Sequence, residues 1–436
     1  MTDLKETAKS VFLRTLHAID PESIIQSKLQ LDGETLRFGN NEIPLEQFSE
    51  IVLIGMGKAS LKMGRAVESL LGHRVKRGIL VTDHHARLPV KSEVIVGGHP
   101  LPDANSLAAG ERIAELVKSC GKDVLLIFLI SGGGSAMVEL PVSPSISLED
   151  LRITNKVLIG CGATIREINL VRKSLSRIKG GGLGLLARNS KSLGLYISDV
   201  NPGDLHSIAS NPLLPEEIGG DAPADVVTRF SLSDRLPGSV VEVLQRDSEG
   251  FSGGWESHAC QTVPMLLLDN SDAIRTAAEE ARQLGFRVEV RADLIEGDYR
   301  TIADQSLQHL LNLKSSFPNE RVCVISGGEV SCPVHGDGVG GRNQEFVLYS
   351  AAKLARMGIR ELAVLSCGTD GIDGNSNAAG AVADAELVIN AARHALDASI
   401  FLSRNDSHRF FRRAGGLVVT GPSGNNVRDL RILMAQ

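Results

Sequence analysis

Short apolar runs alternate with amphipathic stretches along the first 200 residues of the chain. The apolar runs 51–55, 78–82, 93–97 and 124–130 are typical of buried strands, and helical spacing predicts helices over 59–71 and 105–120. Strands of a parallel sheet that is covered on both faces consist of continuous apolar residues of this kind. The alternation therefore predicts an α/β fold whose N-terminal, Rossmann-like parallel sheet carries helices on both faces.

Further elements follow the same pattern. Helical spacing predicts an N-terminal docking helix over 3–18, which ends before Asp20-Pro21, and Ser147 with Asp150 forms a capping-box pattern at another helix start. A helix over 165–178 and a strand over 193–198 are expected next. After an irregular stretch over 235–258, a second α/β series is predicted, with strands near 265–268, 287–290, 321–325, 362–367 and 417–420 and a helix over 272–284. We therefore predict an N-terminal domain over 1–240 and a smaller C-terminal α/β domain over 260–436.

Composition narrows the class of protein. The 436 residues carry 46 Lys or Arg and 52 Asp or Glu, a formal net charge of −6, and 42% of them are hydrophobic, as in ordinary folded proteins. The longest strongly apolar run, 124–130, is far shorter than the ~20 residues of a membrane span, and charges throughout 1–20 argue against a signal peptide. An acidic chain with 12 Phe, 3 Tyr and 1 Trp is unlike a nucleic-acid binder. We expect a cytoplasmic protein with reduced cysteines that binds small molecules, and neither membranes nor nucleic acid.

The 45 glycines concentrate in clusters that each follow a predicted strand. Ligands of open parallel sheets bind beyond the carboxyl ends of the strands, where glycine lets the backbone approach closely and helix N-termini attract anions. Ordinary tight turns would explain any one cluster, but four at equivalent places favour a phosphate or nucleotide site. Its candidate residues are Gly55 and Gly57, then Ser131, Gly132, Gly133, Gly134 and Ser135, then Gly327, Gly328 and Glu329, and finally the cluster 368–374.

Two cations accompany these glycines. Lys58 follows Gly57 at an expected helix start, where a cation suits a transferring phosphoryl group or a carboxylate; the alternative is a solvated surface lysine. Arg342 lies in the glycine-rich segment 335–345 with Asn343 and Glu345, and could clamp a carboxylate or phosphate with two hydrogen bonds; the alternative is a structural salt bridge. Among the basic residues of 166–191, Arg172 or Lys179 are candidates to line the site.

Three acidic residues are candidates for holding Mg²⁺ or for accepting a proton from a hydroxyl. Asp199 follows the strand predicted over 193–198, and Asp370 and Asp373 lie in the fourth glycine cluster. One of them is equally consistent with a turn-forming aspartate. Asp83, at the end of the strand over 78–82, keeps a dinucleotide-binding interpretation open, since a ribose-binding acid occurs at this place. Histidines and cysteines show no zinc-binding spacing.

Taken together and in this order, the motifs resemble the glycerate 2-kinases that have a C-terminal MOFRL domain. The matching segments extend over nearly the whole chain: GMGKAS (55–60), GGHPLPDANS (97–106), LISGGGSAM (129–137), EINLVRKSLSRIKGGGL (167–183), SDV (198–200), SGGE (326–329), GVGGRNQE (338–345), GTDGIDG (368–374) and GPSGNNVRDLRIL (421–433). The chain departs from the family pattern I-A-S-G-P-T at 208–213, where it has IASNPL, and it has Asn425 where Thr is usual.

The resemblance implies ATP- and Mg²⁺-dependent phosphorylation of D-glycerate to 2-phospho-D-glycerate, in a cleft between two α/β domains. It implies catalytic roles for Lys58, Arg342, Asp199 and Asp370, with the two aspartates also as metal ligands. The glycine-cluster residues, with Glu329, Asn343 and Glu345, are expected to contact the nucleotide. Two other functions stay open: a nicotinamide-dependent hydroxypyruvate reductase, and a non-catalytic sensor of a phosphorylated acid. A homo-oligomer is also left open.

Overall fold

The computed structural model of the protein describes residues 3–84, 88–201, 203–214, 222–248, 262–292 and 296–436. The chain divides into two compact units, Pro21–Leu267 and Met1–Asp20 with Leu268–Gln436. The predicted irregular stretch over 235–258 contains helix α10 (Gly238–Ser248), so the expectation of irregular structure is wrong there. The rest of that stretch, 249–258, lies outside the described residues.

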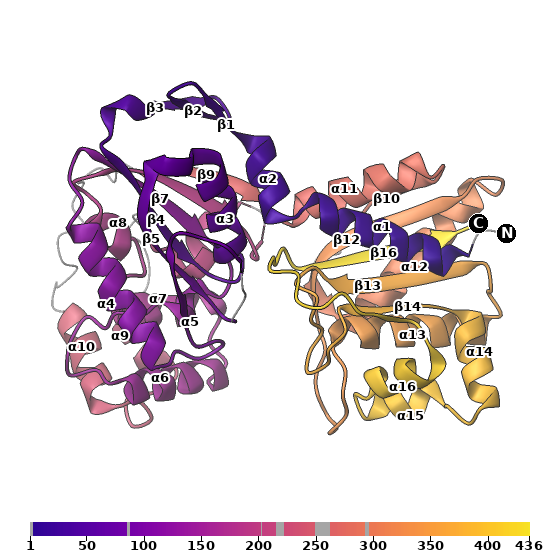
Figure 1. Ribbon diagram of the computed structural model, residues 1–436. Coiled ribbons are helices and arrows are strands. Elements are labelled where there is room, and N and C mark those ends of the chain that lie inside the picture. The colour runs from indigo at the N-terminus through magenta and orange to yellow at the C-terminus, as the bar shows by residue number, and fades with distance from the viewer. Residues whose placement is uncertain (1–2, 85–87, 202, 215–221, 249–261, 293–295) are drawn as a thin grey trace. The chain divides into compact units, whose positions relative to one another are not determined.

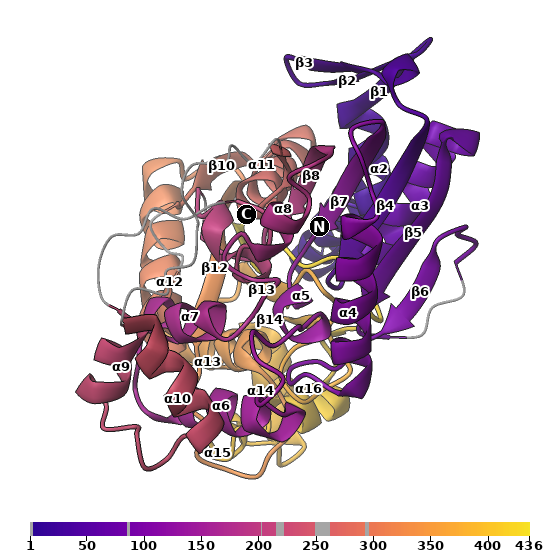
Figure 2. The ribbon, with the colours of Figure 1, turned by 90° about the vertical axis from the view of Figure 1, so that its left-hand side faces the viewer.

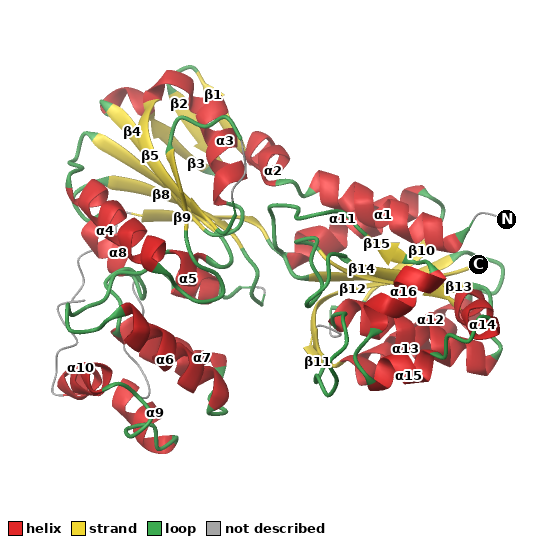
Figure 3. Cartoon of the chain, turned by 60° about the horizontal axis from the view of Figure 1, so that its bottom comes forward, coloured by secondary structure: helices red, strands yellow, loops and turns green. Residues whose placement is uncertain are grey.

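The unit Pro21–Leu267 is built on the predicted sheet. Within the described residues, six strands run in the order β6-β5-β4-β7-β8-β9, and neighbours from β6 to β8 pair in parallel. Figure 3 shows this sheet, with β4, β5, β8 and β9 labelled. Every residue of β7 is buried, as its unbroken apolar sequence predicts. The strands are β4 (Glu50–Met56), β5 (Val75–Thr82), β6 (Glu93–Val96), β7 (Val124–Ile130), β8 (Lys191–Ile197) and β9 (Thr262–Leu268).

Helices cover both faces of this sheet, as the sequence predicts. Helix α4 (Ala104–Lys118) and the short α8 (Gly182–Leu186) share a core with Ile54 and Phe128 on one face (Figure 2). Helix α3 (Ser60–Leu71) packs on β4 and β5 beside α2 (Pro21–Lys28). The predicted helix over 59–71 is thus confirmed. A small antiparallel sheet of β1 (Leu29–Asp32), β2 (Thr35–Phe38) and β3 (Asn41–Pro44) was not predicted.

A separate cluster of helices has its own apolar core in this unit. It contains α6 (Leu148–Gly160), α7 (Ile165–Ser174), α9 (Pro223–Arg229) and α10, packed through residues such as Leu158, Val171 and Val240 (Figure 1). The capping box of α6 is confirmed, since Ser147 Oγ accepts from Asp150 N at 3.1 Å and Ser147 N donates to Asp150 Oδ2 at 2.9 Å. Helix α7 ends at Ser174, four residues before the predicted end.

The second unit contains a mixed sheet. Its seven strands within the described residues follow the order β10-β12-β16-β13-β14-β15, with β11 beside β12. The C-terminal strand β16 lies antiparallel between β12 and β13, although the sequence analysis predicted no strand there. The strands are β10 (Arg287–Val290), β11 (Glu296–Asp298), β12 (Val322–Ser331), β13 (Leu362–Gly368), β14 (Gly380–Asp384), β15 (Leu417–Val418) and β16 (Asp429–Ala435).

The N-terminal helix belongs to this second unit. Helix α1 (Leu4–Ala18) and α11 (Asn270–Gln283) cover one face of the mixed sheet, and Phe12 is fully buried in their shared core (Figure 1). The sequence analysis assigned this segment to a domain over 1–240, whereas the structure packs it with the end of the chain. The opposite face carries α12 (Tyr299–Ser316), α13 (Arg342–Met357), α14 (Ala385–Arg393), α15 (Ala398–Ser403) and α16 (Ser407–Ala414).

Across the described ranges, no helix is long and apolar enough to cross a lipid bilayer. The five cysteines within these ranges are free thiols, and Cys260 lies outside the described residues.

Candidate functional site

Two of the predicted glycine loops form one structure at the carboxyl edge of the parallel sheet. Lys58 N donates to Gly132 O at 2.9 Å, Ser131 N donates to Met56 O at 3.0 Å, and Ala59 N donates to Ser131 Oγ at 3.0 Å. A Cβ on Gly57, whose φ is +115°, would lie only 2.4 Å from Ser131 O. Glycine is therefore required at 57 because the two loops approach each other too closely for a side chain.

The backbone of the second loop leaves several donors available. Ser131, Gly132, Gly133 and Gly134 lie between β7 and the single turn α5 (Gly134–Met137). No acceptor among the described residues pairs with the N–H groups of Gly132, Gly133 and Ser135, although Ser135 Oγ lies 2.8 Å from Ser210 Oγ. By contrast, the N–H groups of residues 57–60 at the start of α3 all donate within the protein. The loop after β7 is thus the better anion cradle of the two.

Asp199 lies directly against this second loop. Asp199 follows β8, which corresponds to the strand predicted over 193–198. Strand β8 is the neighbour of β7 in the sheet. A Cβ built on Gly132 would stand 1.9 Å from Asp199 Oδ2, so the carboxylate occupies the space that a side chain at 132 would need. Lys58, Asp199 and the loop therefore gather at adjacent strand ends, and the Lys58 side chain is half-buried.

The departure from the family pattern at 208–213 has a structural explanation. Ala209, Ser210 and Asn211 all have positive φ, at 50°, 60° and 52°. Asparagine tolerates the left-handed region better than most residues, so Asn211 retains the conformation that the usual glycine supplies. Its buried side chain also donates to Leu214 O at 2.7 Å. The turn is fixed further where Ser210 O accepts from Gly180 N at 3.0 Å.

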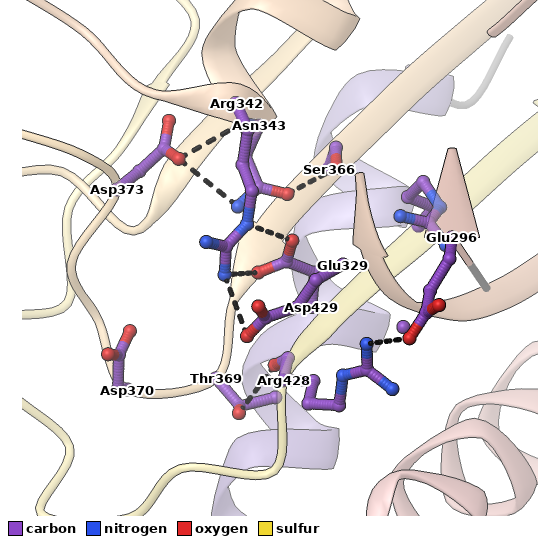
Figure 4. A network of polar contacts seen from close by, with 12 residues as sticks. Glu296, Glu329, Arg342, Asn343, Ser366, Thr369, Asp370, Asp373, Arg428 and Asp429 are labelled. Carbon is purple, nitrogen blue, oxygen red and sulfur yellow. Dashed lines mark hydrogen bonds and ion pairs between the residues drawn. The ribbon is translucent and has the colours of Figure 1, made fainter. Parts of the chain in front are cut away.

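The second unit contains a charged cluster around Arg342, the first residue of α13 (Figure 4). Arg342 Nε donates to Asp429 Oδ2 at 2.6 Å and Nη2 donates to Asp429 Oδ1 at 3.0 Å. Glu329 is a second partner, with Oε1 3.1 Å from Nη2. Burial has the largest single effect and lowers the pKa of Arg342, but attraction to the Asp429, Glu329 and Asp373 carboxylates, with the hydrogen bonds to Asp429, together raises this pKa above its usual value. The alternative of a structural salt bridge is therefore present in the structure, while the guanidinium stays charged.

The acids of the fourth glycine cluster differ in their surroundings. Asp373 is buried and accepts from the backbone N–H groups of Asn343 and Gln344 at 3.0 and 2.9 Å, and from both side-chain amides. Burial raises the pKa of Asp373 to about 6, although these hydrogen bonds lower it. Asp373 thus caps the N-terminus of α13 and provides the acceptor for the backbone N–H and the side-chain amide of the buried Asn343. Asp370 is partly exposed, and its Oδ1 accepts from Ile372 N at 3.1 Å, as in an aspartate turn.

Four other predicted site residues lie inside secondary structure or in a buried ion pair. Gly327 and Gly328 lie inside β12 and not in a loop after it, so that part of the glycine prediction is wrong; Gly328 N donates to Asn270 Oδ1 at 2.8 Å. Glu345 is buried in the first turn of α13, and burial raises its pKa to about 7. Lys179 forms a buried ion pair with Glu139.

Asp429 is the residue at this cluster that sequence reasoning missed. It begins β16 inside the quoted segment GPSGNNVRDLRIL, whose strand the sequence analysis did not predict. The continuous apolar run 432–435, which follows shortly after this aspartate, was the available signal. Among the residues that the structure describes, no three His, Cys, Asp or Glu side chains form a metal-binding group.

Comparison with known proteins relates both units to one family. Residues 7–245 match the family described as a domain of unknown function, DUF4147, and residues 322–429 match the MOFRL family. A glycerate kinase of Bos taurus is 33% identical over 99% of this chain and 93% of its own length. A D-glycerate 2-kinase of Thermotoga maritima is 30% identical over 95% of this chain and 99% of its own length.

A solved structure agrees with these sequence relatives. The crystal structure of a glycerate kinase from Thermotoga maritima superimposes with a TM-score of 0.85 at 28% sequence identity, covering 99% of both chains. The predicted fold class, with its parallel Rossmann-like sheet and a MOFRL-type α/β region, is therefore confirmed.

Proposed function

Because the chain belongs to the family of glycerate kinases that combine DUF4147 and MOFRL domains, we propose that it transfers the γ-phosphoryl group of ATP to D-glycerate. The 2-hydroxyl is the proposed acceptor, so that the product is 2-phospho-D-glycerate, in line with the D-glycerate 2-kinase among its relatives. The observation that carries the proposal is the loop 131–135. It combines N–H groups that have no acceptor among the described residues with a lysine and a carboxylate at adjacent strand ends.

The phosphate-binding part of the proposal uses residues of the unit Pro21–Leu267. The N–H groups of Gly132, Gly133 and Ser135 would donate to phosphate oxygens, and the Lys58 ammonium would neutralise charge on the transferring group. Phosphoryl transfer depends mainly on positioning and charge stabilisation, which glycine loops and a cation provide. Gly57 contributes indirectly, because it allows the two loops to meet, whereas Gly55 lies inside β4, where a Cβ would stand 2.7 Å from Leu80 Cδ2 and 3.0 Å from Ser60 Cβ.

Magnesium fits this arrangement only as an ion that the nucleotide brings with it. No group of three ligating side chains exists within the described ranges, and Mg²⁺ is commonly held by one or two carboxylates together with substrate phosphates. Asp199, beside the loop, would be its protein ligand, and Asp370 is the second candidate. When bound, Mg²⁺ supplies positive charge to the phosphate oxygens.

Recognition of the acid substrate is assigned to Arg342. Two of its nitrogens bind Asp429 and Glu329, and no acceptor among the described residues pairs with Nη1. In Figure 4, the guanidinium nitrogen that has no dashed line points away from Glu329 and Asp429. Nη1 would donate to the D-glycerate carboxylate and so orient the 2-hydroxyl, whose proton Asp370 or Asp199 would accept. Asn343 and Glu345 were first expected to contact the nucleotide. We propose instead that these two buried residues stabilise the first turn of α13, from which Arg342 projects.

The reductase alternative is disfavoured by the start of α3. A nicotinamide dinucleotide places its pyrophosphate on free N–H groups at such a helix start. Here the N–H groups of Gly57, Lys58, Ala59 and Ser60 donate to Val81 O, Gly132 O, Ser131 Oγ and Gly57 O, respectively. Titration with NADH separates the two functions, because a reductase binds NADH and the proposed kinase does not.

Release of ADP from ATP, Mg²⁺ and D-glycerate tests the proposed reaction directly. The product is passed to enolase with and without phosphoglycerate mutase. Direct conversion by enolase indicates phosphorylation at the 2-hydroxyl, whereas dependence on the mutase indicates the 3-hydroxyl. Ligand binding without ADP release would support the sensor. The absence of ADP release with every acid offered would contradict the kinase assignment.

Two substitutions test the assigned residues. Lys58→Ala and Arg342→Ala should each lower kcat/KM on the order of 10²–10³-fold, as the loss of a charge-stabilising donor does. Lys76→Ala and Arg393→Ala are matched controls, because both side chains are exposed outside these clusters. Near-normal kcat/KM in a folded Lys58→Ala or Arg342→Ala protein would show that the residue has another role.

A further inference from the structure

The two carboxylates that contact Arg342 hold it in different ways. Asp429 binds Nε and Nη2 through both oxygens, at 2.6 and 3.0 Å, and its side chain has 0% exposure. Glu329 contacts Nη2 alone at 3.1 Å, and its side chain is 38% exposed. A bidentate pair fixes the plane of a guanidinium, whereas a single contact leaves it free to rotate. Asp429 therefore determines how Arg342 is oriented.

The backbone around Asp429 is equally constrained. Asp429 is the first residue of β16, in register with Gly328 of β12 on one side and Gly368 of β13 on the other. Its carbonyl accepts from Asn270 Nδ2 at 3.1 Å. With glycine at both neighbouring positions, no cross-strand side chain competes for the space above Asp429, and this space receives Arg342 (Figure 4).

The same pair leaves one edge of Arg342 for a ligand. Nε and Nη2 are engaged by protein carboxylates, while Nη1 has no acceptor among the described residues. Asp429 also contributes most of the attraction that, together with Glu329 and Asp373, offsets the effect of burial on the pKa of Arg342 and keeps the guanidinium charged. Fixed orientation and retained charge are the two properties that an arginine needs to bind a small carboxylate with defined geometry.

We infer that Asp429 is a positioning residue, which holds the Arg342 guanidinium so that its Nη1 edge receives the carboxylate of the acid substrate. This inference rests on the proposed function, in which Arg342 binds D-glycerate. Asp429 itself touches neither the substrate nor the nucleotide. Its effect should therefore appear in the binding of the acid and not in the binding of ATP.

Steady-state kinetics of Asp429→Asn test the inference. Asparagine keeps the shape but loses the charge, and the loss of a charge-assisted hydrogen bond should raise KM for D-glycerate by about 10- to 100-fold. KM for ATP should stay within about twofold. Asp304→Asn is the matched control, since Asp304 forms a surface ion pair with Lys353 in the same unit. Equal increases in both KM values, or no increase, would overturn the inference.

A double-mutant cycle separates positioning from a general structural role. If Asp429 acts through Arg342, then Arg342→Lys with Asp429→Asn should raise KM for D-glycerate no further than Arg342→Lys alone. Additive increases would show that Asp429 acts independently of Arg342, contrary to the inference. Should Asp429→Asn not fold, Asp429→Glu replaces it, and an increase confined to KM for D-glycerate is again expected.

A ligand-free measurement keeps the inference testable if the wild-type protein releases no ADP from D-glycerate, which would contradict the proposed function alone. Phenylglyoxal modifies arginine, and mass spectrometry of peptides follows the rate at each site. Release of Arg342 from Asp429 should accelerate its modification in Asp429→Asn. Arg287, which is paired with Glu320, serves as the internal reference and should keep its rate. An unchanged rate at Arg342 would contradict the inference.

Discussion

At the scale of single residues, Gly132 is the position where the predicted phosphate-binding loop 131–135 contacts the predicted acid Asp199. The nearest atom to a Cβ at this position would be Asp199 Oδ2, at 1.9 Å, so Gly132→Ala must displace the carboxylate. A misplacement of about 1 Å can lower an enzymatic rate on the order of 10²-fold, and we expect a loss of this size in kcat/KM. The measurement is the ADP-release assay at saturating ATP.

The control for this change is an alanine at another glycine. A Cβ on Gly160, in the last turn of α6, would meet no atom within 4 Å, so Gly160→Ala should keep full activity. Full activity in Gly132→Ala as well would mean that the position of Asp199 is unimportant, and its proposed role would then have to be abandoned.

At the scale of elements, helix α13 depends on two buried acids near its N-terminus. Asp373 accepts four hydrogen bonds there. By contrast, both carboxylate oxygens of Glu345 lack a hydrogen-bond partner of normal geometry among the described residues, although Ser407 lies next to this carboxyl group. An ionised carboxylate without partners is strongly destabilising in a protein interior. Glu345, whose pKa burial raises to about 7, is therefore mostly protonated in the native protein only below that pH.

This protonation makes stability depend on pH. Burial raises the pKa of Glu345 from 4.5 to about 7, so between these values the native state binds more protons than the unfolded chain. The free energy of unfolding should therefore fall as pH rises from about 4.5 to about 7, by roughly 3 kcal/mol for this group. Glu345→Gln cannot ionise, and at pH 8 its Tm should exceed that of the wild type by about 5 °C.

Thermal unfolding at pH 5 and pH 8 checks this expectation. The gap in Tm between Glu345→Gln and the wild type should be present at pH 8 and small at pH 5. Glu361→Gln changes an exposed carboxylate of the same unit and should follow the wild-type profile. A wild-type Tm that rises with pH relative to Glu345→Gln would have the wrong sign and exclude a protonated Glu345.

The sequence predicts elements better than it predicts their partners. The strands of the parallel sheet follow from unbroken apolar runs, and the capping box of α6 follows from Ser147 and Asp150. Strand β16 escaped prediction because charged Asp429 and Arg431 interrupt its apolar pattern, yet both are buried in the structure. Lys58 and Arg342 were found through their glycine context. The carboxylate that binds Arg342 lies 87 residues further along the chain, and no local pattern connects the two.

At the scale of the whole molecule, the beginning and the end of the chain fold together. Helix α1 shares a core with α11, β13 and β16, and Lys5 forms an ion pair with Asp384 at 2.6 Å. Asn425, where the family usually has Thr, donates from Nδ2 to Ile19 O at 2.8 Å and so holds the end of α1. The unit that contains the MOFRL region is therefore incomplete without the first 20 residues.

Phe12 tests this dependence against its neighbour on the same helix. Phe12 is fully buried, whereas Leu13 is 41% exposed. Phe12→Ala should lower the free energy of unfolding of this unit by about 3–5 kcal/mol, the usual cost of a cavity in place of a buried aromatic ring, and Leu13→Ala should cost less than about 1 kcal/mol. Hydrogen exchange by mass spectrometry gives the location of the effect, because local stability determines exchange. Faster exchange in β13 and β16, with β4 and β7 unchanged, is expected; faster exchange in β4 and β7 alone would place α1 in the other unit.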